Sequence, residues 1–264
     1  MSQVSVGKTG RWWWLLLASF AISLAALTPA VLLEWTLGRT ANPQIRFAAA
    51  TGTVWIGSGR IALAAGVAPV VIPVVWRFDP FSLLHLRLGF FVETNAPALA
   101  GATHIGWRFG EVELRDTVIE ADARLLSMAH SAGVLFAPTG KVRLQQSADE
   151  RFSVWPAFND NETWRVDGLM GLHAEQLVFG GIINAPVGSH ELKLRGDGAT
   201  ISISILRSSG PLKLEGAGNI ALASPRRFTF SGFATTTADA PAALKQLGPI
   251  MADGRQRIEI NTTW

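Results

Sequence analysis

The sequence predicts a mainly β protein, with one N-terminal transmembrane helix followed by a large curved antiparallel β-sheet domain and few short helices. An uncharged apolar stretch occupies residues 12–33, apolar and polar residues alternate along much of residues 45–264, and helical periodicity is sparse. Alternation places every second side chain on the same side of a strand. One face of the predicted sheet therefore turns toward a core and the other toward water.

Residues 12–33 read WWWLLLASFAISLAALTPAVLL and contain no formal charge. A helix of this length covers about 33 Å, and the hydrocarbon core of a bilayer is about 30 Å thick. Trp12 opens a run of three tryptophans and Trp35 follows the stretch, as is typical of the interface between membrane and water. These residues are therefore predicted to form a single membrane-spanning helix, in which Pro29 kinks or ends the last turn.

The cleavage and the orientation of the predicted membrane segment are both left open. Lys8 and Arg11 before an apolar run are also typical of a cleaved signal peptide, although residues 28–30 make a poor cleavage site. Lys and Arg residues near the two ends are equal in number, so charge alone does not decide the orientation. Long domains translocate largely regardless of charge, which favours residues 1–11 in the cytoplasm and residues 34–264 across the membrane.

The chain beyond the apolar stretch is predicted to be a linker and then a β-rich domain. Residues 34–44 contain Gly38, Asn42 and Pro43, which are typical helix breakers. Residues 45–264 form the β-rich domain, either as one continuous sheet or as two packed halves that meet near residues 145–165. Alternation with period two is clear in residues 84–90, 105–109, 201–205, 228–230 and 258–260.

Turn glycines and short helices complete the predicted domain. The motif Gly-polar-β-branched-x-Leu, in which x is any residue, recurs at irregular spacing. This irregularity indicates a strand pattern used several times in one sheet rather than a solenoid repeat. The motif begins at Gly59, Gly110, Gly140 and Gly218. Residues 238–247 are predicted to form a short helix with Asp239 as its N-cap, and residues 124–131 a second helical turn. The last strand is expected to run to Trp264.

Composition and spacing argue against several classes of function. The chain has no cysteine, which removes disulfides, thiolate metal sites and cysteine nucleophiles. Its net charge of +3 comes from dispersed basic residues, so no nucleic-acid surface is expected. The histidines lack metal-ligand spacing and are expected to be exposed or satisfied structural groups. Glu111 and Glu113, at alternate strand positions, are expected to line a solvated face rather than to form a catalytic pair. No catalytic, cofactor-binding or metal-binding residue is predicted, and no enzyme is expected.

Several motifs along the chain together resemble a known family. Residues 52–63 read GTVWIGSGRIAL, and the later motifs are VWRF at 75–78, GKVRL at 140–144, SGPLKL at 209–214 and ALKQLG at 243–248. In this order, soon after an N-terminal apolar segment, they resemble protein N of the bacterial type II secretion system. The resemblance implies a single-pass inner-membrane protein with a cytoplasmic N-terminus and its bulk in the periplasm. It implies no catalytic residue and no cofactor.

Two hypotheses for function follow. The first is an accessory bitopic component of the type II secretion pathway, which acts by protein–protein contacts in the export of folded proteins across the outer membrane. Its expected partners are the inner-membrane bilayer and other secretion components, with the secretin among the candidates, and no nucleic acid or small-molecule substrate. The alternative is an inner-membrane-anchored periplasmic lipid-handling protein with an apolar β-groove. An open apolar trough would favour lipid handling, and a filled core would favour the first hypothesis.

Overall fold

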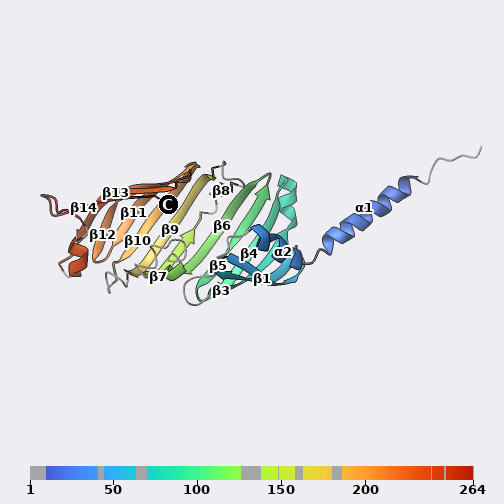
Figure 1. The fold of residues 1–264 in the computed structure, drawn as a ribbon, viewed down its shortest axis with the longest axis horizontal. Helices are drawn as coiled ribbons and strands as arrows, with labels where there is room; N and C mark the ends of the chain where they lie inside the picture. The colour runs from blue at the N-terminus through green and yellow to red at the C-terminus, as the bar shows by residue number, and fades with distance from the viewer. Residues whose placement is uncertain are drawn as a thin grey trace, which may run out of the picture.

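The protein forms one sheet of fourteen strands with helical segments at both of its ends (Figure 1). The computed structural model describes residues 10–40, 45–63, 70–125, 138–147, 149–157, 163–179, 186–238, 240–246 and 248–263. The helices are α1 (Gly10–Ala26), α2 (Val31–Thr40) and the 3-10 helices η1 (Pro80–His85), η2 (Ala123–Leu125) and η3 (Ala242–Gln246). The strands are β1 (Ile45–Gly52), β2 (Ile56–Leu63), β3 (Val70–Asp79), β4 (Leu88–Ala96), β5 (Leu99–Arg108), β6 (Glu111–Asp122), β7 (Pro138–Gln145), β8 (Phe152–Trp155), β9 (Arg165–Phe179), β10 (Ser189–Gly198), β11 (Thr200–Ser209), β12 (Leu212–Ala221), β13 (Arg227–Thr236) and β14 (Gln256–Thr263).

The strands follow one another across the sheet in chain order, and all the pairs are antiparallel. Only β8 departs from this path: β7 and β8 both lie between β6 and β9, each pairing with part of these longer strands. With about 4.8 Å between neighbouring strands, the row from β1 to β14 extends over about 60 Å. The predicted fold class of a mainly β chain with a large antiparallel sheet and few short helices is confirmed.

Two hydrophobic clusters fill the ends of the sheet. At the β1–β4 end, Ile72 and Trp76 are buried together with Ala30, and Leu33 from the start of α2 packs against them. At the β12–β14 end, Leu212 and Ala234 are buried beneath Leu244 of η3. The tightest packing therefore lies where α2 and η3 meet the sheet, about 50 Å apart along the row of strands.

The N-terminal apolar segment differs from the prediction, because α1 ends at Ala26 and α2 begins only at Val31. The residues between these helices pair with the β1–β2 turn. Pro29 forms a bridge with Thr53, and the Ala30 N–H donates to the Gly52 carbonyl at 3.0 Å. Since Pro29 has no N–H and its neighbours bond to the sheet, the helix cannot continue through them. Among the residues that the structure describes, no helix is both long enough and apolar enough to cross a membrane.

The predicted linker is helical over residues 34–40, because α2 continues through Gly38. An isolated glycine weakens a helix by only about 1 kcal/mol, and tertiary contacts can outweigh that cost. Glu34 supplies one such contact, since its Oε2 accepts a 3.4 Å hydrogen bond from the Ala50 N–H on β1. Asn42 and Pro43 lie outside the described residues.

The remaining helical segments match the prediction in part. Residues 238–247 contain η3, a 3-10 helix, while Asp239 and Leu247 lie outside the described residues. Residues 124–131 contribute to η2, and residues 126–131 lie outside them as well. Strand β14 ends at Thr263, and Trp264 is likewise outside the described residues.

Helix η1 was not predicted, and the expected alternation over residues 84–90 is therefore wrong in its first half. Asp79 caps η1 by accepting a 3.0 Å hydrogen bond from the Phe81 N–H, and Pro80 occupies the first turn. Leu86 then takes a left-handed conformation with φ of 55°, and β4 begins only at Leu88. The local signal for a helix start thus overrides the alternating leucines.

Candidate functional site

The candidate site is one whole face of the sheet. In antiparallel pairs, directly opposed residues point to the same side. The register therefore identifies which residues of successive strands lie on the same side of the sheet, for example Leu144, Leu172 and Leu192. We call this side the apolar face; it carries Trp76, Ile105, Leu144, Leu192, Ile203 and Ile258. The opposite side, the charged face, carries Arg77, Glu113, Arg143, Lys193, Glu215 and Arg257.

The two faces differ sharply in charge. Among the strand residues that the register pairs, every Asp, Glu, Lys and Arg lies on the charged face. The ends of the apolar face are covered by α2 and η3. Between these ends, Val142, Val166, Met170 and Ala174 are buried, whereas several larger apolar side chains are only half-buried. In the described part of the chain, no second sheet packs on this middle section. Ile105, Leu114, Leu144, Leu172, Leu192 and Ile203 belong to this uncovered middle. Extended apolar surfaces of this kind are typical of sites that bind other molecules.

One ionisable side chain, His190 on β10, lies among the paired residues of the apolar face. It opposes Ala174 on one side and Ser208 on the other, and only 7% of it is exposed. Its Nδ1 lies 2.9 Å from the Ser208 Oγ, while its Nε2 has no hydrogen-bond partner. Burial lowers the pKa of His190 below its ordinary value of 6.5, so the imidazole is held neutral on this face. The expectation that the histidines are exposed or satisfied is wrong for His190, because it is buried and its Nε2 has no partner. The neighbouring residues along β10 gave no sign of this in the sequence.

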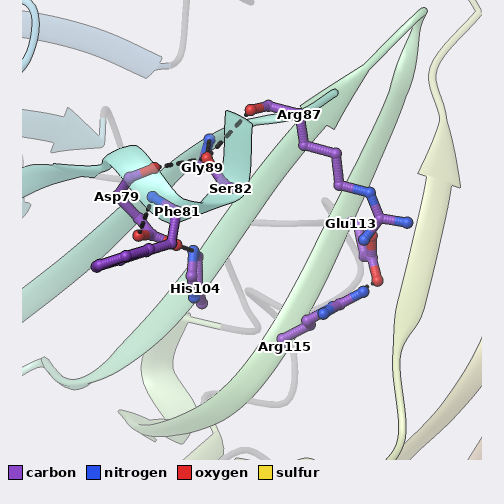
Figure 2. Close-up of polar contacts among 8 residues, drawn as sticks. All are labelled: Asp79, Phe81, Ser82, Arg87, Gly89, His104, Glu113 and Arg115. Carbon is purple, nitrogen blue, oxygen red and sulfur yellow. Dashed lines mark hydrogen bonds and ion pairs between the residues drawn. The ribbon is translucent and has the colours of Figure 1, made fainter. Parts of the chain in front are cut away.

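The charged face contains a buried carboxylate under η1 (Figure 2). Glu113 on β6 is only 2% exposed and lies between two arginines. The Arg115 Nε donates to its Oε1 at 2.6 Å, and the Arg87 Nη1 pairs with its Oε2. The expectation of a solvated face is therefore wrong for Glu113, because the Arg87 and Arg115 side chains pair with its carboxylate and shield it from water. Glu111, its predicted neighbour, instead accepts a 2.7 Å hydrogen bond from the Ser153 Oγ.

Helix η1 is fastened above this carboxylate by Ser82 and Asp79. The Ser82 Oγ accepts from the Gly89 N–H at 2.8 Å and donates to the Asp79 carbonyl at 2.6 Å. The Asp79 carboxylate lies 3.3 Å from the His104 Nε2. Asp79, Ser82 and His104 line a cavity of about 150 Å³ together with Glu113. Since both oxygens of Glu113 are paired with arginines, the cluster positions η1 rather than presenting a free acid or base. Within the described ranges, no group of three or more His, Cys, Asp and Glu could hold a metal ion.

The sequence of the sheet matches one family model. The family model for type II secretion system (T2SS), protein N matches residues 43–259, from the start of the sheet into β14. The chain belongs to the type II secretion system protein N family. The resemblance seen in the sequence motifs is thereby confirmed. No curated protein and no solved structure matches the chain significantly.

In this member of the protein N family, the first two resemblance motifs meet in space. The Trp76 Nε1, from the VWRF motif, donates to the carbonyls of Thr53 and Val54, from the GTVW motif, at 3.2 and 3.0 Å. The Trp55 Nε1 donates to the Ala25 carbonyl at 2.6 Å, and the Val54 N–H donates to Thr28 at 2.9 Å. The two motifs therefore build the joint between α1 and the sheet, a role that their spacing alone did not reveal.

Replacing Glu113 tests whether its carboxylate holds η1 and the two arginines together. Glu113→Gln leaves Arg87 and Arg115 without their buried counter-charge, and we expect a loss of about 3–5 kcal/mol in the free energy of unfolding. Denaturant unfolding of the detergent-purified full chain, followed by circular dichroism, measures this loss. Glu120→Gln is the matched control: it removes a charge from an exposed pair with Lys141 and Arg143, and should change stability little. Equal losses in the two variants would contradict a structural role for Glu113.

Acid should weaken the fold through His190. Because its pKa is lowered in the folded state, the imidazole binds a proton more readily once unfolded, so its contribution is present above about pH 6.5 and lost below that value. We expect His190→Leu to reduce the fall in unfolding midpoint between pH 7.5 and pH 5.5, measured by thermal denaturation. Ser208→Ala retains the imidazole and should retain the pH dependence. An unchanged pH dependence in His190→Leu would rule out this histidine as its source.

Proposed function

We propose that the chain is an accessory bitopic component of the type II secretion pathway, anchored in the bacterial inner membrane with its sheet in the periplasm. It acts by protein–protein contacts in the export of folded proteins across the outer membrane. The family match over residues 43–259 carries this proposal, because it includes nearly the whole sheet. The family is a secretion-system component, and it implies contacts with other components of that system, with the secretin among the candidates.

The character of α1 supports the proposed anchor. Residues 12–17 are all exposed, and together they cover more than one helical turn with Trp and Leu. A helix that is apolar on all sides is suited to lipid rather than to water. Its 17 residues stand at the lower end of the range for membrane-spanning helices, about 17 to 25 residues. The proposed orientation, with residues 1–11 in the cytoplasm, follows from the secretion context.

The two outer strands of the sheet offer unequal edges for protein contacts. At one end, α2 packs on β1. At the other end, a short segment covers only the first part of β14, where the Arg257 N–H donates to the Pro249 carbonyl at 3.1 Å. Since alternate residues of a strand point the same way, Asn261 and Thr263 also turn their backbone groups outward. No described segment pairs with them, so this half of β14 is the edge on which a partner strand could add.

Crosslinking from the open part of β14 tests the proposed contacts. A photo-crosslinking residue at Asn261, in a secreting strain, should trap another secretion component. The matched control is Asn219, which is exposed on β12 inside the sheet and should not give the same product. Gly59 on β2, near the opposite end of the sheet, is not a suitable position for the crosslinking residue, because it is buried against Phe47 and Trp76. Normal secretion after deletion of the gene, together with no crosslinked component, would contradict the secretion role.

Lipid handling is a second candidate, and the uncovered middle of the apolar face favours it. The two packed hydrophobic clusters lie at the ends of the sheet, whereas several strands between them leave Leu and Ile side chains half-exposed beside the buried Val142, Val166, Met170 and Ala174. Burying such surface is worth about 25 cal/mol per Å², so acyl chains would gain free energy by covering it. The face contains no charged group among its paired residues, which is the chemistry that acyl chains require. An inner-membrane anchor would place this face beside a source of lipid.

Introducing a charge on the apolar face tests the lipid-handling hypothesis. Ile203→Lys places an ammonium group on the apolar face, and Ser202→Lys places the same group on the charged face one residue away. Mass spectrometry of the detergent-purified full chain should find about tenfold less phospholipid with Ile203→Lys, a loss equivalent to about 1.4 kcal/mol, than with Ser202→Lys. Lipid bound through α1 is the same in both variants. Equal lipid content in the two would remove the lipid hypothesis.

A further inference from the structure

Large apolar side chains project from two neighbouring connections of the sheet. Phe81 and Leu84 on η1 are 74% and 80% exposed, Leu86 just after η1 is 70% exposed, and Phe109 in the β5–β6 turn is 84% exposed. The two connections are adjacent, because Leu88 at the start of β4 pairs with Trp107 near the end of β5. We call Phe81, Leu84, Leu86, Trp107 and Phe109 the turn patch. Turns normally carry polar residues and glycine, so this composition is unusual for its position.

Backbone conformation adds a second, independent observation. Leu86 and Phe109 have positive φ values of 55° and 44°. This left-handed region favours Gly, Asn and Asp, and bulky side chains adopt it only at a cost in free energy. Strained positions of this kind cluster at functional sites, although Ala49, Asp116 and Gln176 also have positive φ in this sheet. The strain at Leu86 and Phe109 thus accompanies the exposure of the same two side chains.

The turn patch lies on the edge of the sheet from which α1 departs. In an antiparallel meander, alternate connections lie at the same edge, so the β1–β2, β3–β4 and β5–β6 connections share one. The first of these is joined to the end of α1 through Trp55 and Val54, which bond to Ala25 and Thr28. Figure 1 shows α1 projecting beyond the end of the sheet formed by β1–β4.

Charge at the patch matches a membrane interface. The Arg108 guanidinium lies 5.8 Å from the centre of the Phe109 ring. Arginine–aromatic contacts occur elsewhere on this sheet, but here the ring is exposed at a connection, where it could enter lipid while the cation stays at the level of anionic headgroups. A bilayer satisfies the apolar tips and the cation together.

We propose that the turn patch inserts into the interfacial layer of the same bilayer that holds α1. The proposal rests on the membrane anchoring proposed above. The sheet then meets the membrane at two places, through α1 and through the connections flanking β4 and β5. The second contact sets the orientation of the sheet relative to the bilayer, because a single anchoring helix leaves the sheet free to rotate about the helix axis. Trp107, which lies on the apolar face, brings that face to the membrane surface.

The absence of cysteine from the chain allows a direct test with single-cysteine variants of the full chain. Leu84→Cys and Phe109→Cys are labelled with an environment-sensitive fluorophore and reconstituted into vesicles of phosphatidylethanolamine and phosphatidylglycerol. Both probes should shift their emission to shorter wavelength and lose most of it when the lipids carry spin-label quenchers. Ile250→Cys, an exposed position before β14, is the control and should show neither effect. Leu17→Cys in α1 reports on the anchor.

The outcomes separate the proposal from the anchoring on which it rests. Quenching at Leu17 without quenching at Leu84 and Phe109 would overturn the turn-patch proposal while leaving the anchor intact. No quenching at any of these positions would overturn both. A shift in emission without quenching by the lipid-borne spin labels would indicate contact between protein copies and would also overturn the proposal. Circular dichroism of each labelled variant verifies that the sheet is retained.

Discussion

A sheet with one uncharged face has to cover that face, and this constraint shapes the whole protein. In the described residues, helices cover it mainly at the ends, where α2 packs over Ile72 and Trp76 and η3 packs over Leu212 and Ala234. The strands between are joined by ladder hydrogen bonds and by contacts between neighbours on the same face, of which the larger apolar side chains stay half-exposed. The proposed binding of other molecules depends on this incomplete burial.

The joint at the first turn determines how this sheet relates to the N-terminal helix. Residues 28–30 form strand-like bonds with the β1–β2 turn, and Trp76 fixes that turn from beneath by bonding to Thr53 and Val54. The chain passes from α1 into the sheet through paired backbone rather than through a free linker. A force or displacement at α1 is thus transmitted to the sheet. Under the proposed anchoring, this joint would couple α1 to the sheet in addition to raising the local concentration of the domain.

Residues 201–205 show what the sequence made predictable, because strict alternation of Ile with Ser assigns the two faces of a strand without knowledge of its neighbours. Residues whose surroundings come from distant parts of the chain were predicted less well. Pro29 was expected to end a helix, but its pairing with Thr53 depends on a turn formed later in the chain. Glu113 followed the correct alternation and still became buried, because Arg87 reaches it from the β3–β4 connection and Arg115 pairs with it as well. The local sequence pattern assigns side chains to the two faces of the sheet, whereas the segments that cover the sheet and the connection between α1 and the sheet depend on tertiary contacts.

The geometry allows the two proposed functions to occupy different parts of one sheet. The proposed membrane contacts lie at the β1–β6 end, while the open edge of β14 lies at the opposite end, about 60 Å away along the row of strands. Between them runs the apolar face, which Trp107 connects to the turn patch. A partner strand added at β14 would extend that face, because Ile258 and Ile260 alternate with charged residues up to the edge. Protein contact at one end and lipid contact along the face are therefore compatible, since neither requires the residues that the other uses.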